Sequence, residues 1–334
     1  MGFTGKKIAV DLGSTTTRIY VPRKGLVLVE PTIIARDEET DEIVAFGSDA
    51  IEMAGRSPET IIVSHPLQAG VIADYKATTA LLKHYLGQSM GRFQIKKPEA
   101  MITVSGTATS TERRALIDAG IDAGLQEVHL IKGAVASALG SGLPITEPRG
   151  NVIVDIGGGT TEIGVFSLGG VVAQESIRIG GNSINDAIQR LLRREHGTQI
   201  GISETERLKS TFLDMGNGEN ITTTVHGRNT LQGLPKSTDV RLGQLQAYSE
   251  TALERIVFAI RRVLEKTPPD LISDIIKHGV IISGGSSQIK NLDHYFGKRL
   301  NVAFMTSQDP ELSSIKGAHI ALTHLSDYKR SLLT

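Results

Sequence analysis

Residues 10–21 read VDLGSTTTRIYV, and residues 154–165 read VDIGGGTTEIGV. Each stretch begins with an apolar, β-branched run that ends at an aspartate, continues through a turn of Gly, Ser and Thr, and returns as a second alternating run. This order is the pattern of a β-hairpin. Because Asp11 and Asp155 hold the same place in the two stretches, we interpret the sequence as a duplication. It predicts two related lobes, each close to a usual domain size.

The composition sets broad limits on the class of protein. A chain of 334 residues suits two domains better than a single core. It has 36 Lys and Arg against 36 Asp and Glu, so its charge gives no general attraction to nucleic acid, and we expect no nucleic-acid partner. The neutral balance also permits self-association. No residue is cysteine, which excludes disulfides and thiolate metal sites.

Targeting and membrane-spanning segments are not apparent. The start, MGFTGKK, lacks an apolar signal segment. No run of about 18 apolar residues occurs, so we predict no transmembrane helix. The sequence therefore predicts a globular, cytoplasmic protein.

Strands and helices are expected to alternate outside the two hairpins. Apolar, β-branched runs predict further strands at 25–29, 100–105, 169–175 and 279–283. Helical spacing of apolar residues predicts helices over 75–87, 112–123 and 244–265. Thr109 with Glu112 forms a capping box for the second helix, and Pro268 with Pro269 stops the third. This alternation is typical of an α/β fold whose sheets are covered by helices.

The first hairpin turn has the residues of a phosphate-binding loop. Gly13 permits a tight turn and the close approach of a ligand. The hydroxyls and backbone N–H groups of Ser14, Thr15 and Thr16 can surround phosphate oxygens. Asp11, at the end of the preceding strand, would face a phosphate-bound magnesium ion through water. Taken alone, the turn is equally consistent with an ordinary polar hairpin.

The second turn favours the ligand-binding interpretation. Gly157, Gly158 and Gly159 are followed by Thr160, and Asp155 again ends the strand. Three consecutive glycines are costly in conformational entropy, and they are tolerated most readily where backbone touches a ligand. Two facing loops of this kind would form a phosphate clamp with an acidic residue on each side.

A third glycine turn lies in residues 280–293, VIISGGSSQIKNLD. A strand is expected to end at Ser283, the chain to turn at Gly284 and Gly285, and a helix to begin near Ser287. This turn would bring backbone close to a nucleoside and a helix N-terminus close to phosphate. By itself it is more consistent with a plain connection between a strand and a helix.

Signatures of other common sites are missing from the sequence. There is no GxxxxGK[ST] run, no GxGxxG after a strand, no HExxH and no GxSxG elbow between a strand and a helix. A P-loop in its usual form is excluded, and a dinucleotide fold, a histidine metal site and a hydrolase nucleophile elbow are unsupported.

The motifs resemble those of a known superfamily. DLGSTTT, DIGGGTTE and the SGG turn are similar to the two phosphate loops and the adenosine loop of actins, sugar kinases and heat-shock chaperones. Within that superfamily, longer segments, several of them outside the loops, are similar to MreB, the family of bacterial actins of rod-shaped cells. These segments are GVIADYKAT (70–78), ERRALIDAGIDAG (112–124), GNVIVDIGGGTTEIGV (150–165), ESIRIGG (175–181) and EKTPPDLISDII (265–276).

The resemblance implies an actin-like, duplicated two-lobed α/β fold, in which each lobe is a mixed sheet flanked by helices plus a small subdomain. The implied core of lobe I is residues 1–32, 66–146 and 316–334, and its small subdomain is residues 33–65. The implied core of lobe II is residues 147–180 and 245–315, and its small subdomain is residues 181–244. ATP or ADP with Mg²⁺ would lie in the cleft between the lobes, with Asp11 and Asp155 at the metal.

The resemblance also implies residues at the nucleoside. In GISETERLKS (201–210), Glu206 and Lys209 match the family positions that hold the ribose and adenine. Their spacing places both on one face of a helix. A plain surface ion pair is the alternative. At the third turn, Gly284, Gly285 and Ser286 match the adenosine loop.

The sequence departs from the family where water is activated. The family usually reads EEP before the following helix, and its second glutamate helps to polarise the attacking water, whereas Lys132 and Gly133 stand at the two glutamate positions here. Thr160 matches another family position at that water, and Asp155 could substitute in part. Because activation needs an acceptor within hydrogen-bond reach, we expect slow or altered hydrolysis and at most weak ATPase activity.

Partners and a location are implied as well. MreB-like proteins form antiparallel double protofilaments on the inner face of the cell membrane, so we expect a homopolymer, with paralogous MreB-like subunits as further candidates. MGFTGKK is too short and glycine-rich for the amphipathic N-terminal helix of some members. In GRFQIKKP (91–98), Phe93 and Ile95 beside three cations offer a weak tether to anionic lipid. An ordinary surface loop is an equal alternative.

Nucleotide-regulated assembly is the leading interpretation of function, in support of cell shape or membrane-associated organisation. A small-molecule kinase and a chaperone-type ATPase are alternatives on the same fold. The kinase needs a carboxylate base aimed at a substrate hydroxyl, and none is recognisable. The chaperone would continue into a peptide-binding domain, whereas this sequence ends at Thr334.

Overall fold

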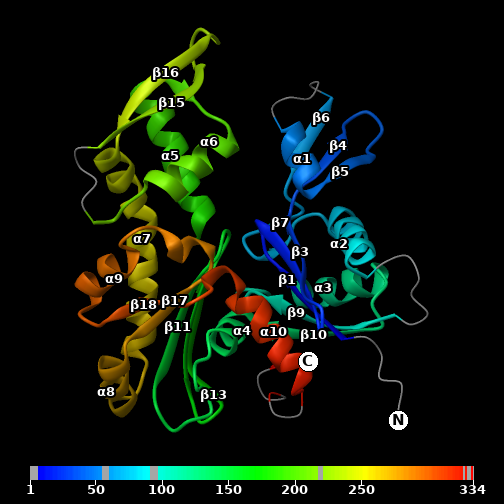
Figure 1. Cartoon of the computed structure of the whole chain (residues 1–334), viewed down its shortest axis with the longest axis vertical. Helices are drawn as coiled ribbons and strands as arrows, with labels where there is room; N and C mark the ends of the chain where they lie inside the picture. Colours follow the sequence, from blue (N-terminus) through cyan, green and yellow to red (C-terminus); the bar gives the residue numbers. More distant parts are fainter. Residues whose placement is uncertain are drawn as a thin grey trace.

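The molecule consists of two lobes that stand side by side, each with a smaller subdomain at the same end (Figure 1). The structure is a computed structural model, and it describes residues 7–54, 60–90, 97–216 and 221–325, together with 328, 332 and 333. The first lobe contains the amino-terminal hairpin, and the second contains the hairpin that begins at residue 151. The two-lobed, actin-like α/β architecture expected from the sequence is confirmed.

The central sheets of the two lobes have the same topology. The first sheet, in the order β19-β10-β9-β1-β2-β3, contains β1 (Lys7–Leu12), β2 (Thr16–Val21), β3 (Gly25–Pro31), β9 (Glu99–Val104), β10 (Glu127–Lys132) and β19 (Leu332–Leu333). The second, in the order β13-β12-β11-β17-β18, contains β11 (Asn151–Ile156), β12 (Thr161–Ser167), β13 (Gly170–Ile177), β17 (Val280–Ser283) and β18 (Phe304–Thr306). In both sheets, three antiparallel strands are followed by two strands that add in parallel beside the first. This shared topology confirms the predicted duplication.

Each lobe carries a small sheet that the two hairpins alone do not predict. The elements beside the first lobe are β4 (Ile34–Asp37), β5 (Ile43–Phe46), β6 (Ile61–Ser64) and α1 (Gly47–Met53), and the two-stranded ribbon of β7 (Leu67–Gln68) and β8 (Val71–Ile72) follows them. The elements beside the second lobe are α5 (Gly181–His196), β14 (Thr198–Gln199), α6 (Ile202–Arg207), the π-helical segment Leu208–Phe212, β15 (Thr222–Asn229) and β16 (Pro235–Arg241). The boundaries proposed for the subdomains stay predictions.

The helices predicted from apolar spacing are present with shifted ends. They are α2 (Tyr75–Met90), α3 (Ser110–Asp122) and α7 (Leu242–Glu265), and α8 (Pro269–His278) follows the two prolines. The capping box of α3 is formed as expected, because Thr109 and Glu112 exchange side-chain and backbone hydrogen bonds. The prediction that a helix begins near Ser287 is wrong. A short 3-10 turn (Gly285–Gln288) occupies that place, and α9 (Leu292–Leu300) begins only after Asn291 adopts a left-handed conformation.

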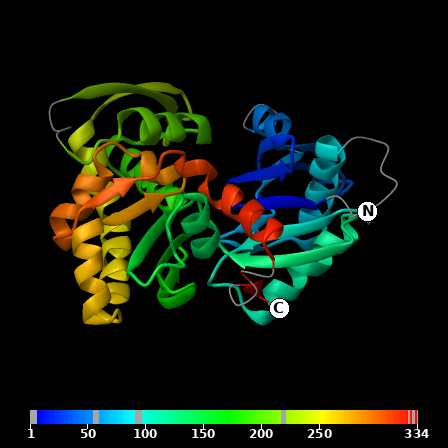
Figure 2. The same cartoon turned by 60° about the horizontal axis from the view of Figure 1, so that its bottom comes forward.

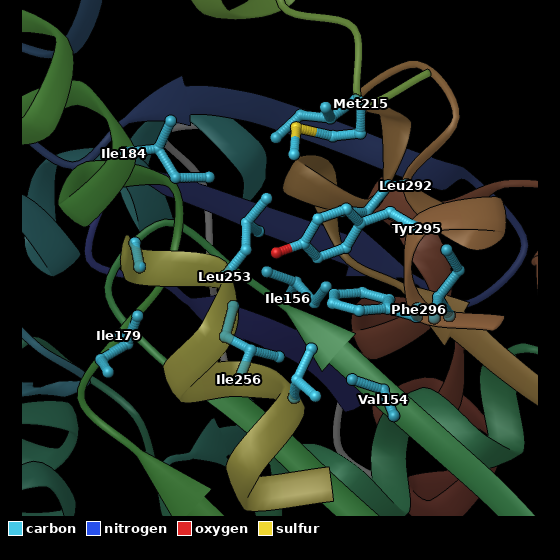
Figure 3. Close-up of a cluster of buried hydrophobic side chains, with 14 of the residues drawn as sticks. Val154, Ile156, Ile179, Ile184, Met215, Leu253, Ile256, Leu292, Tyr295 and Phe296 are labelled. Carbon is cyan, nitrogen blue, oxygen red and sulfur yellow. The ribbon is translucent and has the colours of Figure 1, made fainter. Parts of the chain in front are cut away.

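A large apolar core fixes the sheet of the second lobe. Val154 and Ile156 of β11 are fully buried against Leu253 and Ile256 of α7 and Phe296 of α9 (Figure 3). Burial of one such side chain contributes roughly 1.5–3 kcal/mol relative to exposure. The core therefore holds β11 firmly up to the strand end, where Asp155 lies.

Two short helices join the lobes. They are α4 (Gly133–Gly140) and α10 (Ser313–Thr323), and Figure 2 shows α10, in red, between the two halves of the molecule. Helix α4 follows β10 of the first sheet and packs on β11 and β12 of the second, whereas α10 follows the second sheet and packs on β1 and β9 of the first. A separate apolar cluster unites Met101 of one sheet and Phe166 of the other with both helices.

Glycines allow these two helices to touch along their backbones. A Cβ atom on Gly140 would lie 1.7 Å from the Ser313 carbonyl oxygen, and one on Gly317 would lie 1.7 Å from the Ala136 carbonyl oxygen. No side chain fits at such distances, so the two helices must separate if either glycine is replaced.

We predict that Gly317→Ala lowers the free energy of unfolding by about 1–3 kcal/mol, because overpacking at a close helix contact forces backbone shifts. The measurement is urea denaturation followed by circular dichroism. The matched control is Gly87→Ala in α2, where an added Cβ has no neighbour within 4 Å; there the higher helix propensity of alanine should stabilise by about 0.5–1 kcal/mol. Equal stabilities of the two variants would contradict the close contact.

Candidate functional site

A cavity of about 980 Å³ lies between the lobes, and every residue predicted at the phosphates, the metal or the nucleoside lines it. These residues are Asp11, Gly13, Ser14, Thr15, Thr16, Asp155, Gly157, Gly158, Gly159, Thr160, Glu206, Lys209, Gly284, Gly285 and Ser286. The volume lies within the range of pockets that bind small molecules and cofactors, about 300–1,000 Å³. The fold therefore brings together segments of both lobes at one site.

The two hairpin turns have the same internal geometry. The Gly13 N–H donates to the Thr16 carbonyl oxygen at 3.2 Å, and the Gly157 N–H donates to the Thr160 carbonyl oxygen at 2.9 Å. The two residues between the bonded ones line the cavity in both turns. They are Ser14 and Thr15 in the first turn and Gly158 and Gly159 in the second. Repeated geometry in the two lobes makes the turns a matched pair.

The glycines of the second turn meet the first turn directly. A Cβ on Gly158 would lie 1.9 Å from the Thr15 hydroxyl oxygen, and a Cβ on Gly159 would lie 2.6 Å from the Ser14 hydroxyl oxygen. The sequence pattern attributes these glycines to contact with a ligand, whereas the structure shows that the facing turn already requires two of them. The Ser14 hydroxyl also accepts a hydrogen bond from the Gly70 N–H at 2.8 Å.

The two aspartates face the same cavity from opposite lobes. Asp11 Oδ1 accepts a hydrogen bond from the Thr103 hydroxyl at 2.6 Å, and Asp155 Oδ2 accepts one from the Ser137 hydroxyl at 2.5 Å. Burial raises the pKa of Asp155 to about 7; the Ser137 hydrogen bond opposes this shift, and the charges of Asp11 and Glu162 add to it. The geometry thus agrees with the expectation that Asp11 and Asp155 share one site.

The residues present fit a hard divalent cation. The carboxylates offer oxygen ligands, and the negative charges of Asp11 and Glu162 add to the rise in the pKa of Asp155 that burial causes. Among the described residues, no group of three or more His, Cys, Asp or Glu side chains forms a cage for a metal. A cation here would therefore take its other ligands from water and a bound anion, which is the usual manner of Mg²⁺.

Two residues that line the cavity from α6 and the π-helical segment are held by a hydrogen-bonded ion pair. Lys209 Nζ lies 2.8 Å from Glu206 Oε1, which also accepts from Asn185 Nδ2 at 2.5 Å. Glu206 and Lys209 thus form an ion pair and also line the cavity, so an ion pair between them is compatible with a role in binding. The two residues do not share one regular helix, since Glu206 lies in α6, which ends at Arg207, and Lys209 lies in the π-helical segment.

The third turn is fixed by Gly284, whose φ is +82°. A Cβ there would lie 2.4 Å from Asp155 Oδ1, so only glycine fits between the turn and that carboxylate. The Ser286 hydroxyl donates to the Gly157 carbonyl oxygen at 3.1 Å. The third turn is therefore attached to the second, which the sequence alone does not indicate.

Sequence reasoning missed Asp186 and Glu311, and it also missed a charged pair that lines the cavity, Arg18 and Glu162. They are equivalent in the duplication, because Arg18 pairs with Asp11 across the first hairpin and Glu162 pairs with Asp155 across the second. Side chains directly opposite on antiparallel strands lie on one face of a sheet. Aligning GSTTTR with GGGTTE would have identified both.

Glu162 joins the two lobes. Its side chain accepts hydrogen bonds from the Ser105 hydroxyl at 2.8 Å, from the Gly106 N–H at 3.2 Å and from the Ser176 hydroxyl at 2.5 Å. Ser105 and Gly106 follow β9 of the first lobe, whereas Ser176 belongs to β13 of the second. Burial raises the pKa of Glu162, and these hydrogen bonds with the nearby charge of Lys132 oppose that shift.

Gly133 lines the cavity beside Glu162, as the altered family motif predicts. A Cβ at position 133 would lie 3.3 Å from Glu162 Cγ, which is tight but open to a small adjustment. Lys132 is not among the residues that line the cavity, and its charge acts on Glu162.

The predicted membrane contacts Phe93 and Ile95 lie outside the described residues. Within the described part of the chain, no helix combines the length and the apolar character needed to cross a bilayer.

Comparison with known proteins gives a consistent result. The family model described as MreB/Mbl protein matches residues 5–330. The cell shape-determining protein MreB of Escherichia coli (strain K12) is 36% identical over 327 residues, which cover 96% of this chain and 94% of that protein. The cell shape-determining protein Mbl of Bacillus subtilis (strain 168) is 35% identical over 308 residues, with 91% and 92% covered.

Solved structures show the same likeness. The crystal structure of MreB 5 of Spiroplasma citri bound to AMPPNP has a TM-score of 0.92 at 30% identity and covers 98% of this chain and 99% of that one. A MamK double helical filament has a TM-score of 0.79 at 19% identity, covering 96% and 99%, and it supports the fold alone.

We predict that Asp155→Asn stabilises the protein more at pH 8 than at pH 5 when nucleotide and divalent cations are removed with EDTA. A carboxyl group whose pKa is raised to about 7 in the folded state binds more protons when folded, so its presence costs stability increasingly as the pH rises from about 4 to about 7. The difference between the two pH values should be on the order of 2 kcal/mol.

The measurement is urea denaturation of wild type and variant at both pH values. Asp270→Asn, at an exposed position of α8, controls for the loss of one carboxyl group. A stabilisation by Asp155→Asn that is the same at pH 5 and pH 8 would refute the electrostatic explanation.

Proposed function

This chain belongs to the MreB/Mbl protein family, and we propose that it is a nucleotide-dependent cytoskeletal filament protein that binds Mg-ATP in the cleft between its lobes. The observation that carries the proposal is the matched pair of turns at Gly13 and Gly157, which face one cavity with an aspartate beside each. Backbone N–H groups and hydroxyls in such turns bind phosphate oxygens without needing a cation at every contact.

Each part of the cavity has a proposed role in this complex. The turns of residues 13–16 and 157–160 would bind the phosphates. Asp11 and Asp155 would hold Mg²⁺ through water, and the ion would neutralise charge on the phosphates. Glu206 and Lys209 would hold the ribose and adenine, and the turn at Gly284, Gly285 and Ser286 would lie against the adenosine.

We further propose that hydrolysis is slow. Gly133 has no side chain to orient water, and Glu162 beside it already accepts hydrogen bonds from Ser105, Gly106 and Ser176. Thr160 would contact the water, and the carboxylate of Asp155 would assist in part. Because an acceptor with free lone pairs is needed for general base catalysis, the site is better suited to holding ATP than to cleaving it.

Self-association is the proposed output of nucleotide binding. Closure of the cleft would fix the relative angle of the lobes and thus present one fixed surface to the next subunit. The equal numbers of acidic and basic residues oppose assembly little. By analogy with the family, we propose antiparallel double protofilaments in the cytoplasm at the inner face of the membrane, with paralogous subunits as possible copolymers and a role in cell shape. The kinase and chaperone alternatives are not carried forward, because no specific observation favours them.

We predict that purified protein forms filaments with Mg-ATP, because a bound nucleotide would hold the lobes in one arrangement. Sedimentation and negative-stain electron microscopy over a range of salt and protein concentrations provide the measurement. The matched control is Asp11→Asn, which should weaken Mg-dependent assembly while leaving the fold intact. Failure of the wild type to pellet or to form filaments under any of these conditions would refute the proposed function.

We also predict that Gly133→Glu raises the rate of phosphate release by about tenfold or more, since a positioned acceptor for water contributes roughly 10²–10⁴-fold. Single-turnover phosphate release with Mg-ATP is the measurement. Gly133→Ala adds a Cβ without an acceptor and should stay at the wild-type rate. If Gly133→Glu folds and binds nucleotide but releases phosphate no faster, another group orients the water.

A further inference from the structure

Arg18 is a largely buried cation that lines the cavity. Only 13% of its side chain is exposed, and its two ion pairs are long, with Nη1 3.6 Å from Asp11 Oδ2 and Nη2 3.4 Å from Glu311 Oε2. Its Nε is buried and has no hydrogen-bond partner among the residues that the structure describes. A structural Arg–carboxylate pair would instead be bidentate at about 2.7–2.9 Å.

The donors of Arg18 are therefore largely unused. A guanidinium group carries five N–H donors in a fixed fork, and buried charges are normally paired and hydrogen-bonded. Of these donors, Nη2 makes a hydrogen bond, to Glu311, which is itself half-exposed and also accepts from Gln288. Because Glu311 is half-exposed, solvent weakens this pair, and the pair can be exchanged at low cost.

Carboxylates outnumber cations among the residues that line the cavity, so an anionic ligand there needs a positive charge beside it. The carboxylates that line the cavity are Asp11, Asp155, Glu162, Asp186, Glu206 and Glu311. Among the described lining residues, the Lys and Arg side chains are Arg18 and Lys209. Lys209 is paired with Glu206, and its Nζ lies beside Gly181, which is bonded to Gly157 of the second turn. Arg18, in β2 directly after the first turn, is the cation on the side of that turn.

We propose that Arg18 is a polyphosphate-binding residue of the cleft, and that it exchanges its contact with Glu311 for phosphate oxygens when nucleotide binds. The inference rests on the proposed nucleotide binding. It adds Arg18 as a phosphate-binding residue and Glu311 as a carboxylate that competes with phosphate for Arg18. Planar guanidinium groups suit phosphate because they can donate two parallel hydrogen bonds. Glu311 lies in the 3-10 turn Pro310–Leu312 directly before α10, so the exchange also frees the connection to that helix.

The test is isothermal titration calorimetry with Mg-AMPPNP, at a protein concentration that light scattering shows to be below assembly. Arg18→Met removes the cation and keeps an apolar stem, and it should weaken binding roughly ten- to hundredfold, the range for hydrogen bonds to charged groups. Arg255→Met removes a cation from an exposed position of α7 and should bind within twofold of wild type. Thermal unfolding checks that each variant is folded.

The competitor is tested by Glu311→Gln, which should tighten binding about two- to fivefold by freeing Arg18. This gain should vanish in the Arg18→Met background, because the two effects act through one contact. Asp186→Asn removes another lining carboxylate that the structure does not place against Arg18, and it should give a smaller gain.

The outcomes separate this inference from the proposed function. If the wild type fails to bind Mg-AMPPNP, the proposed function is wrong. If the wild type binds and Arg18→Met binds within twofold of it, only the role of Arg18 is overturned. A gain from Glu311→Gln that persists in the double variant overturns the exchange. If Arg18→Met does not fold, the test is the affinity of Glu311→Gln for Mg-AMPPNP compared with that of Asp186→Asn. Equal affinities of those two variants overturn the proposal.

Discussion

The contact between the two hairpin turns across the cleft is the constraint on which the rest of the structure depends. Gly158 and Gly159 have no room for side chains because Thr15 and Ser14 of the other lobe occupy that space. The turns can meet only because the sheets are related by duplication, so that β1 and β11 end at the same place from opposite sides. The apolar core behind β11 and the capped helix α3 beside β10 hold the two sheets in this arrangement. Movement of the end of β1 or of β11 would separate the turns.

The electrostatics of the cleft follow from that approach. Asp155 lies opposite Glu162 within one hairpin and near Asp11 of the other, so negative charges accumulate where water is scarce. Like charges directly opposite each other destabilise a sheet. The protein tolerates them because hydroxyl and backbone donors satisfy the carboxylates, with Ser137 on Asp155 and Ser105 on Glu162. A cleft of this kind is poised for a cation and for an anion that accompanies it.

Much of the fold could be predicted from the sequence, because the decisive signals are local. The paired hairpins, the capping box at Thr109 and the prolines after α7 each reflect interactions within a few residues. The helix expected near Ser287 failed because a 3-10 turn with its own backbone bonds replaces an α-helical start there. At the site, the glycines and aspartates were recognised from their pattern. Arg18 and Glu162 were not, since a charged residue in an alternating strand normally faces solvent, and each of these two is covered by residues far away in the sequence, Glu311 for Arg18 and Ser105 with Gly106 for Glu162.

The backbone contact between α4 and α10 has a mechanical consequence. Helices whose glycines rest on each other's carbonyl oxygens cannot slide along their axes without collision, because neighbouring positions bear side chains. They can still tilt about the point where they cross. The two lobes therefore rotate about the point where α4 and α10 cross, and they do not slide past each other. The displacement that such a rotation causes grows with distance from the crossing. The small sheets, which stand farthest from it (Figure 1), would travel most for a given change at the turns.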